Sequence, residues 1–378
     1  MDFTFTEEQQ AAVEAARAVF SGVAPDGVPS PALSPGAVAE EFDRPLWARL
    51  ADADLLSLVV SPEHGGAGLD PIALCLVLRE SAKVLARVPL LETSAVAMAV
   101  QRFGSETLGA DILPRVGRGE LVLTVGANGR TGHDTAELAV TARKDGELWV
   151  LDGVQTGVPW AQCADLIAVP AHTDEGRAVL ALVPRGLEGL TLAEQISTSG
   201  ELFAEARLDS VRIEGGAVID AKGAWEWLRG LLATGTCALA LGLGERVLSM
   251  TSEYTSKREQ FGFPVATFQA VAVQAADRYI DLRAMEATLW QAAWRISTGA
   301  GGALPPAGDI AVAKIWASDG VRRIVQTAQH LHGGFGADTD YPLHRYHAWA
   351  KQLELSLGPA AAHEEALGDL LAAHPLGS

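Results

Sequence analysis

The feature that most constrains this chain is a series of long helical patterns from about residue 221 to its end. Apolar residues recur at helical spacing over four segments of about 30 residues each, 223–256, 265–298, 306–332 and 342–373. Clusters of glycine and proline separate the second segment from the third, and glycines separate the third from the fourth. Helices of that length run about 40–50 Å and bury their apolar faces against one another, which predicts a four-helix bundle.

Two regions with different sequence patterns precede the predicted bundle. Residues 6–117 also show helical spacing, whereas about 100 residues from 120 to 220 consist of short runs rich in β-branched residues, separated by Gly, Asp or Asn. We therefore predict an α+β chain in three parts. These are an N-terminal helical domain (1–117), a central antiparallel β-domain (118–220) and a C-terminal helical bundle (221–378).

Composition excludes several classes of function. A formal charge of −18 repels phosphate backbones, so the chain is not expected to bind nucleic acid. Cys75, Cys163 and Cys237 are odd in number and widely spaced, which indicates a reducing compartment and neither disulfides nor structural zinc. The N-terminus is acidic and polar, and no apolar run reaches the roughly 18 residues of a membrane span. We expect a cytoplasmic protein with no membrane contact.

Several weaker motifs allow a functional interpretation, but a simpler one is favoured. His330, His332, His344 and His347 could suggest a metal site, but no acidic or cysteine ligands are organised around them, so we predict none. The stretches GLGER (242–246) and GANGRTG (126–132) imitate dinucleotide fingerprints without the strand–turn–helix context. The small residues of ATGTCALALGLG (233–244) are better explained as close helix contacts.

Two stretches of the predicted bundle are specific enough to indicate a family. They are TSKREQFGFPVATFQAVAVQAAD (255–277) and AQHLHGGFGADTDYPLHRY (328–346). With SPEHGGAGLD (61–70) and the order helices, β-domain, helices, they make the whole chain resemble the acyl-CoA dehydrogenase family. In detail the chain looks most like the actinobacterial members that act as unequal partners in heteromeric dehydrogenases of sterol-derived CoA thioesters.

The resemblance implies a catalytic glutamate that this chain lacks. In the family this base removes the proton next to the thioester carbonyl while the neighbouring carbon delivers a hydride to the flavin of FAD. Its usual position, a fixed distance after the glycine turn, falls here on Leu357. A second position used by other members, on the first bundle helix, falls on Leu232. No catalytic residue is therefore expected, although Glu354, Glu364 or Glu365 could act as a displaced base.

The resemblance also indicates that the chain's own flavin-ring contacts are lost. The family's Thr-Glu-Pro and Gly-Ser-Asp elements correspond to TVGANGRTGHD (124–134), with Val125 and Gly126 in place of Glu-Pro. Its Trp-Ile-Thr stack corresponds to Gly157, Val158 and Pro159. A proline has no N–H to donate. We predict that this chain does not form a working ring pocket.

The residues that family members extend to a neighbouring subunit's FAD are retained. An arginine suits the diphosphate because it presents a planar, permanently charged fork of donors, and glycines let backbone N–H groups come close. His330 stands where many relatives have glutamine. The expected cofactor-binding residues are Arg258, Phe261, Phe268, Gln269, His330, Gly333 and Gly334.

Three hypotheses follow from the resemblance. The leading one is a non-catalytic subunit that completes the FAD site of a homologous catalytic subunit, with acyl-CoA mainly on that partner and an electron-transfer flavoprotein as acceptor. The second is a self-sufficient homo-oligomeric dehydrogenase with a relocated base. The third is a flavin-free homologue kept as a binding or scaffold protein. The sequence does not identify the acyl group.

Overall fold

The computed structural model describes residues 4–27, 34, 36–39, 42–132 and 137–374. Five helices precede the sheet, and four of them begin at a side chain that caps the helix. Thr6, Asp43, Asp70 and Ser105 each accept a hydrogen bond from a first-turn backbone N–H, which satisfies a donor that the helix itself leaves free. The helices are α1 (Glu7–Phe20), α2 (Arg44–Asp52), α3 (Pro71–Ala82), α4 (Leu90–Phe103) and α5 (Glu106–Gly117), with a short turn η1 (Pro62–His64) between α2 and α3.

One eight-stranded sheet forms the middle of the chain. Its order is β6-β7-β3-β2-β4-β5-β8, with β1 beside β4. Most neighbours are antiparallel, as predicted, but β4 pairs in parallel with both β1 and β2, so the fully antiparallel expectation was wrong. Alternation alone carries no information on strand direction. The strands are β1 (Leu123–Val125), β2 (Val140–Asp145), β3 (Leu148–Pro159), β4 (Leu166–Thr173), β5 (Ala178–Pro184), β6 (Leu190–Ile196), β7 (Leu202–Glu214) and β8 (Val218–Ile219), with the turn η2 (Gly215–Ala217) between β7 and β8.

The C-terminal part confirms three of the four predicted helices and corrects the fourth. The segment 342–373 is two helices, because the chain turns sharply at residues 356–359, where Leu357 has φ 56° and Gly358 has φ 96°. The helices are α6 (Ala224–Lys257), α7 (Gln269–Thr298), α8 (Pro306–His332), α9 (Leu343–Leu355) and α10 (Ala360–Ala373). Between them lie the β9–β10 hairpin (Glu259–Gln260 and Phe263–Pro264) and the turns η3 (Val265–Thr267) and η4 (Gly333–Ala337).

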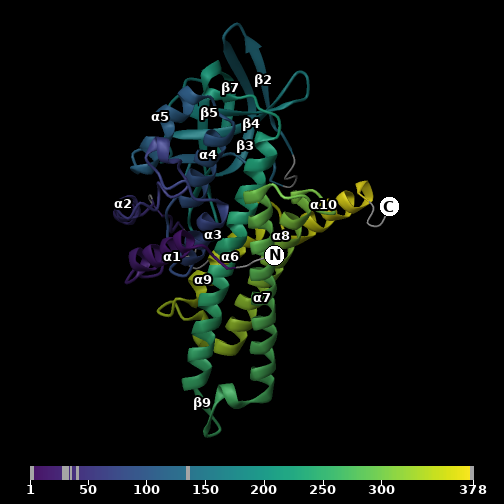
Figure 1. Ribbon diagram of the computed structural model, residues 1–378. Coiled ribbons are helices and arrows are strands. Elements are labelled where there is room, and N and C mark those ends of the chain that lie inside the picture. The colour runs from purple at the N-terminus through teal and green to yellow at the C-terminus, as the bar shows by residue number, and fades with distance from the viewer. Residues whose placement is uncertain (1–3, 28–33, 35, 40–41, 133–136, 375–378) are drawn as a thin grey trace.

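The three parts are held together mainly through α6. Figure 1 shows the sheet at one end of the molecule, α6 running from it to the β9 end, and the N-terminal helices along one side. One hydrophobic core joins the N-terminal helices to the bundle, and a second lies within the sheet. A Cβ on Gly242 would lie 1.9 Å from the backbone oxygen of Arg79 on α3. This confirms that small residues of α6 permit close helix contact.

Helix α6 is also the one helix among the described residues that is long and apolar enough to cross a membrane. However, 78% of its most apolar window is buried inside the protein, which is the environment of a core helix.

Candidate functional site

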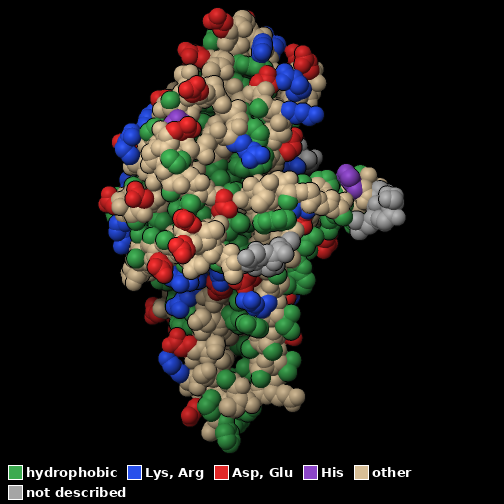
Figure 2. Space-filling view, in the orientation of Figure 1, with side chains coloured by type: hydrophobic (Ala, Val, Ile, Leu, Met, Phe, Trp, Pro, Cys, Tyr) green, Lys and Arg blue, Asp and Glu red, His purple; other side chains and the backbone are tan. Residues whose placement is uncertain are grey.

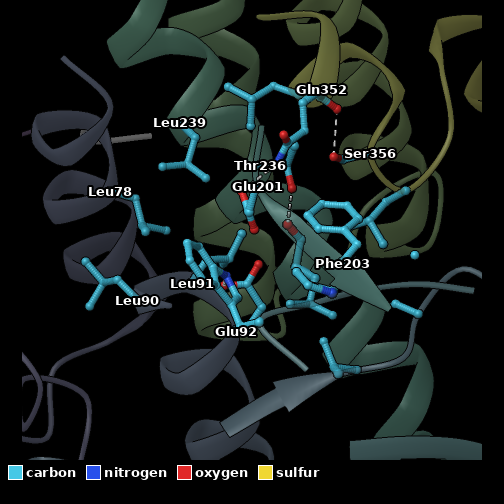
Figure 3. A pocket seen from close by; sticks show the side chains of 18 of the residues that line it. Leu78, Leu90, Leu91, Glu92, Glu201, Phe203, Thr236, Leu239, Gln352 and Ser356 are labelled. Carbon is cyan, nitrogen blue, oxygen red and sulfur yellow. Dashed lines mark hydrogen bonds between the residues drawn. The ribbon is translucent and has the colours of Figure 1, made fainter. Parts of the chain in front are cut away.

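A small cavity lies where the sheet, the N-terminal helices and the bundle meet. Its volume is about 110 Å³, well below the roughly 300–1,000 Å³ of a typical ligand pocket. Figure 3 shows that side chains from α3, α4, α6, β7 and α9 point into it. The wall is mostly aliphatic and includes Leu78, Val88, Leu90, Leu91, Leu239 and Leu353.

The structure brings the two expected base positions together in this cavity. Leu232 on α6 is 2% exposed, and Leu357 lies in the sharp turn between α9 and α10, yet both side chains line the same space. These positions are 125 residues apart in the chain (357 − 232). At the two positions where the resemblance predicts a base, this chain thus presents aliphatic side chains, neither of which can take up a proton.

Of the expected ring-contact positions, Val125, Gly157 and Pro159 line the same cavity, and Gly126 and Val158 do not. The backbone polar groups of Gly157 and Pro159 are already engaged. The N–H of Gly157 donates to Oε1 of Gln195 (2.8 Å), and its carbonyl accepts from Nδ2 of Asn128 (3.0 Å). The carbonyl of Pro159 accepts from the Thr124 hydroxyl. A flavin ring needs hydrogen-bond donors at its edge and a large slot, and these residues supply neither. The residues present therefore do not fit a ring in this chain's own cavity. His133 and Asp134 of the eroded flavin motif lie outside the described residues.

Two carboxyl groups that the motif analysis missed line the cavity, Glu201 buried and Glu92 half-buried. Glu92 on α4 accepts from Nε1 of Trp160 (3.1 Å), and Glu201, just before β7, accepts from Nε2 of Gln352 (2.9 Å). Burial raises the pKa of Glu92 to about 7 and that of Glu201 to about 8. No local pattern marks either residue, because both stand outside the matched motifs and become buried only when distant segments meet.

The three carboxylates considered as a displaced base do not line the cavity. Glu354 points toward basic neighbours, with Oε2 at 2.6 Å from Nζ of Lys351 and Oε1 at 3.8 Å from Arg322. Glu364 and Glu365 are exposed on α10. Helix-face carboxylates in ion pairs or in solvent have no contact with the cavity, so these residues are not candidates for a base there.

At the opposite end of α6, Arg258 is presented to solvent. It is the residue at which α6 ends, its backbone N–H bonds to the carbonyl of Tyr254, and the tight β9–β10 hairpin follows. Its exposed guanidinium has no hydrogen bond or ion pair within the described ranges. Phe261 at the hairpin tip is 90% exposed and meets Phe268 edge-on at 6.4 Å, and Gln269, which opens α7, is also exposed.

The glycine turn lies beside this end of α6. The Tyr254 hydroxyl donates to the carbonyl of His332 (3.4 Å), and the Tyr254 ring stacks on Phe335 at 5.3 Å. Gly333 has φ 60° and ψ −137°, a conformation that a residue with a side chain rarely adopts. A Cβ at Gly333 or Gly334 would meet nothing within 4 Å, and His330 is exposed. The turn therefore offers open backbone to an approaching group.

Arg258 and the glycine turn both adjoin Tyr254, and each has chemistry suited to a diphosphate. Arg258 supplies a charged fork of donors without an internal partner, and the turn supplies exposed backbone. By contrast, the described residues contain no group of three or more His, Cys, Asp or Glu that could hold a metal ion. The residues thus fit the phosphate half of FAD, approached from outside the chain, better than its ring half.

A helical domain, a central sheet and a long-helix bundle are the architecture of the acyl-CoA dehydrogenase fold. The sequence matches the acyl-CoA dehydrogenase N-terminal domain over residues 6–120 and the C-terminal domain over residues 231–371. The chain belongs to the acyl-CoA dehydrogenase family, a family that binds FAD, as its motifs predicted.

Three similar proteins are themselves heteromeric or mycobacterial members of this family. Acyl-CoA dehydrogenase FadE27 of Mycobacterium tuberculosis is 35% identical over 99% of this chain and 100% of its own. A chain of the ChsE4–ChsE5 complex from the same organism is 35% identical, with a TM-score of 0.90 over 99% of this chain and all of that chain. A variant of the steroid acyl-CoA dehydrogenase Tcur3481–Tcur3483 matches at 36% identity and a TM-score of 0.88, over 97% and 98% of the two chains.

Proposed function

We propose that this chain is the non-catalytic subunit of a heteromeric FAD-dependent acyl-CoA dehydrogenase, and that it completes the FAD site of a homologous catalytic subunit. The proposal rests on the contrast between the cavity and the exposed end of α6 in this chain. The cavity where the base and ring would act is small and lined by Leu232 and Leu357, whereas Arg258 is exposed without an internal partner and the glycine turn leaves open space around Gly333 and Gly334. Heteromeric relatives at 35–36% identity support this division of labour.

The work of this chain's residues in such a complex is binding and orientation. FAD, when bound, accepts the hydride in the partner's site. Here the Arg258 guanidinium would hold its diphosphate, the uncrowded backbone at Gly333 and Gly334 would let the phosphate oxygens come close, and Phe261, Phe268, Gln269 and His330 would contact its adenosine side. We further propose a heterotetramer in the cytoplasm, with the acyl-CoA, of sterol type, mainly on the partner and an electron-transfer flavoprotein as acceptor.

The surface next to this half-site suits a protein partner. Val273 and Ile280 lie seven residues apart on one face of α7, and Figure 2 shows hydrophobic side chains gathered toward the β9 end of the molecule. Contiguous exposed apolar side chains of this kind mark interaction surfaces. In the β9–β10 hairpin and α7, the large apolar side chains exposed by more than half are Phe261, Phe263, Val273, Tyr279 and Ile280.

The flavin spectrum tests the proposal directly. The chain purified alone is expected to hold little FAD and to show no acyl-CoA dehydrogenation, because it has no base and no ring slot. Co-produced with a candidate homologous subunit, it is expected to yield a yellow complex with turnover. Stoichiometric flavin and turnover in the chain alone would refute the proposal, and a partner complex without flavin would favour the scaffold hypothesis.

Arg258→Ala is expected to lower FAD retention of the mixed complex by roughly 10- to 150-fold in affinity, since a charge-assisted bond is worth about 1.5–3 kcal/mol. Arg258→Lys should recover only part, because an ammonium cannot make the forked contact. The matched control is Arg212→Ala, which removes an exposed arginine of the sheet. FAD titrations of the wild-type complex and of the three variant complexes measure the affinity. Equal affinity in all four would show that Arg258 has no cofactor role.

Ile280→Asp is expected to weaken partner association at least about tenfold, because burying Ile contributes about 1.5–3 kcal/mol and a buried charge adds a further cost. Ile280 is 62% exposed, so the isolated chain should keep its melting temperature. Ile196→Asp, at a 49% exposed position on β6, is the control. Sedimentation of the mixed subunits measures the association. Equal association of the two variants with the partner would show that this face of α7 is not part of the interface.

A second candidate function keeps a base within the chain. Glu92 and Glu201 are the carboxyl groups that line the cavity beside Leu232 and Leu357, so a relocated base would have to be one of them. The small volume and the engaged Gly157 contacts count against it, because a base needs a hydride acceptor across the substrate. Steady-state rates of Glu92→Gln and Glu201→Gln in the complex test this alternative, which predicts a loss of about 10²–10⁴.

A further inference from the structure

Lys314 of α8 is completely buried, at 0% exposure, which is rare for lysine. Its ammonium is surrounded by oxygens and forms no ion pair within the described part of the chain. Nζ lies 2.8 Å from Oγ of Ser318, 3.1 Å from the carbonyl oxygen of Gly358, and 3.3 Å from those of Leu353 and Glu354. Three of the four acceptors therefore belong to the backbone where α9 ends and the chain turns toward α10.

The turn between α9 and α10 has an unusual need for such a donor. A helix leaves its last four carbonyls without intrahelical partners, and here the turn packs against α8. Ser356 donates to Gln352, Gly358 donates to Leu355, and Lys314 satisfies the two carbonyls between them. Ser318 adds a second donor to Glu354, and Nε2 of His363 bonds to the carbonyl of Leu357. Every carbonyl from residue 352 to 355 thus has a partner.

We propose that Lys314 is the positioning residue of the α9–α10 turn, and that its ammonium fixes the turn so that residue 357 forms a wall of the cavity. The negative end of the α9 dipole and the Gly358 carbonyl together replace the water that a buried ammonium loses. These contacts also hold Leu357 at φ 56°, a left-handed conformation that costs a leucine about 1 kcal/mol or more. An aliphatic residue at 314 would fill the same space and leave the carbonyls of Leu353 and Gly358 without a donor.

This inference goes beyond the proposed function and does not depend on it, because it concerns the chain by itself. Whatever residue stands at position 357, the Lys314 contacts decide where its side chain points. In this chain these contacts place a leucine in the cavity wall.

Native-state hydrogen exchange of the whole isolated chain tests the proposal at the amides of Ser356 and Gly358, which donate within the turn. Lys314→Met keeps the length and apolar volume of the side chain but removes its donors. It is expected to speed exchange at these two amides at least about tenfold, the low end for losing a charge-assisted bond. Amides of the sheet should change little. Lys314→Gln, which retains donors, is expected to restore part of the protection.

The matched control is Lys351→Met, which removes another lysine beside Glu354 but none of the bonds to the turn. It should leave exchange in the turn unchanged. If Lys314→Met fails to fold, Ser318→Ala offers a milder test, because it removes one ligand of the ammonium and one donor to Glu354, and several-fold faster exchange in the turn is expected. Unchanged exchange in Ser318→Ala and Lys314→Met, or equal loss of protection in Lys314→Met and Lys314→Gln, would overturn the proposal.

Discussion

Restoring a glutamate at position 357 is expected to create no dehydrogenase activity in this chain. Leu357→Glu would place a carboxylate in the cavity, but the cavity measures about 110 Å³ and the backbone of Gly157 is already bonded to Gln195 and Asn128. A base without a hydride acceptor across the substrate cannot complete the reaction. The measurement is the steady-state rate of acyl-CoA oxidation by the variant chain alone, with wild type as reference.

The complementary change lies on the partner. Replacing the partner's catalytic glutamate by glutamine should lower turnover of the complex by about 10²–10⁴, the usual contribution of a general base. In this chain, Glu354→Gln and Glu364→Gln should leave turnover nearly intact, because neither residue lines the cavity. A hundredfold loss from Glu92→Gln or Glu201→Gln, with the partner's glutamate dispensable, would establish the relocated base instead.

Glu92 and Glu201 are each expected to make the isolated chain less stable as pH rises through the neutral range, against the opposite contribution of His363, whose pKa is lowered by desolvation to about 4. Burial raises the pKa values of the two glutamates to about 7 and about 8, so the folded chain keeps protons that the unfolded chain releases above its ordinary carboxyl pKa of about 4.5. Their stabilising contribution is complete below about pH 4.5 and is lost on the way to pH 7–8. Between pH 5 and 8.5 the loss is roughly 3 kcal/mol for each group, taken alone.

Glutamine at either position should flatten this dependence, because it accepts the same hydrogen bond from Trp160 or Gln352 and does not titrate. Urea unfolding of wild type, Glu92→Gln and Glu201→Gln at pH 5 and pH 8.5 measures the difference. Glu364→Gln, on an exposed stretch of α10, is the control and should keep the wild-type slope. Parallel slopes in all four proteins would show that neither carboxyl group carries a proton into the neutral range.

Much of the architecture was predictable because it rests on local rules. Helical spacing located α6, α7 and α8 to within a few residues, and the capping residues and glycine clusters mark where helices begin and end. The fourth segment was misjudged because its periodicity continues across residues 356–359. Gly358 and Pro359 are a local signal for a helix end that this interpretation passed over. Tertiary contacts, among them those of the Lys314 ammonium, accompany the left-handed conformation of Leu357.

The candidate site was likewise predictable only in part. The sequence by itself determined the identity of the residues at the base and ring positions, and the presence of Arg258 and the glycine turn, because motifs keep their spacing along one chain. Only the tertiary structure decided that Leu232 and Leu357 share one cavity with Glu92 and Glu201, that Arg258 is left without a partner among the described residues, and that Lys314 is enclosed by carbonyls. Burial and proton affinity depend on segments more than a hundred residues apart, and no local pattern encodes which of them meet.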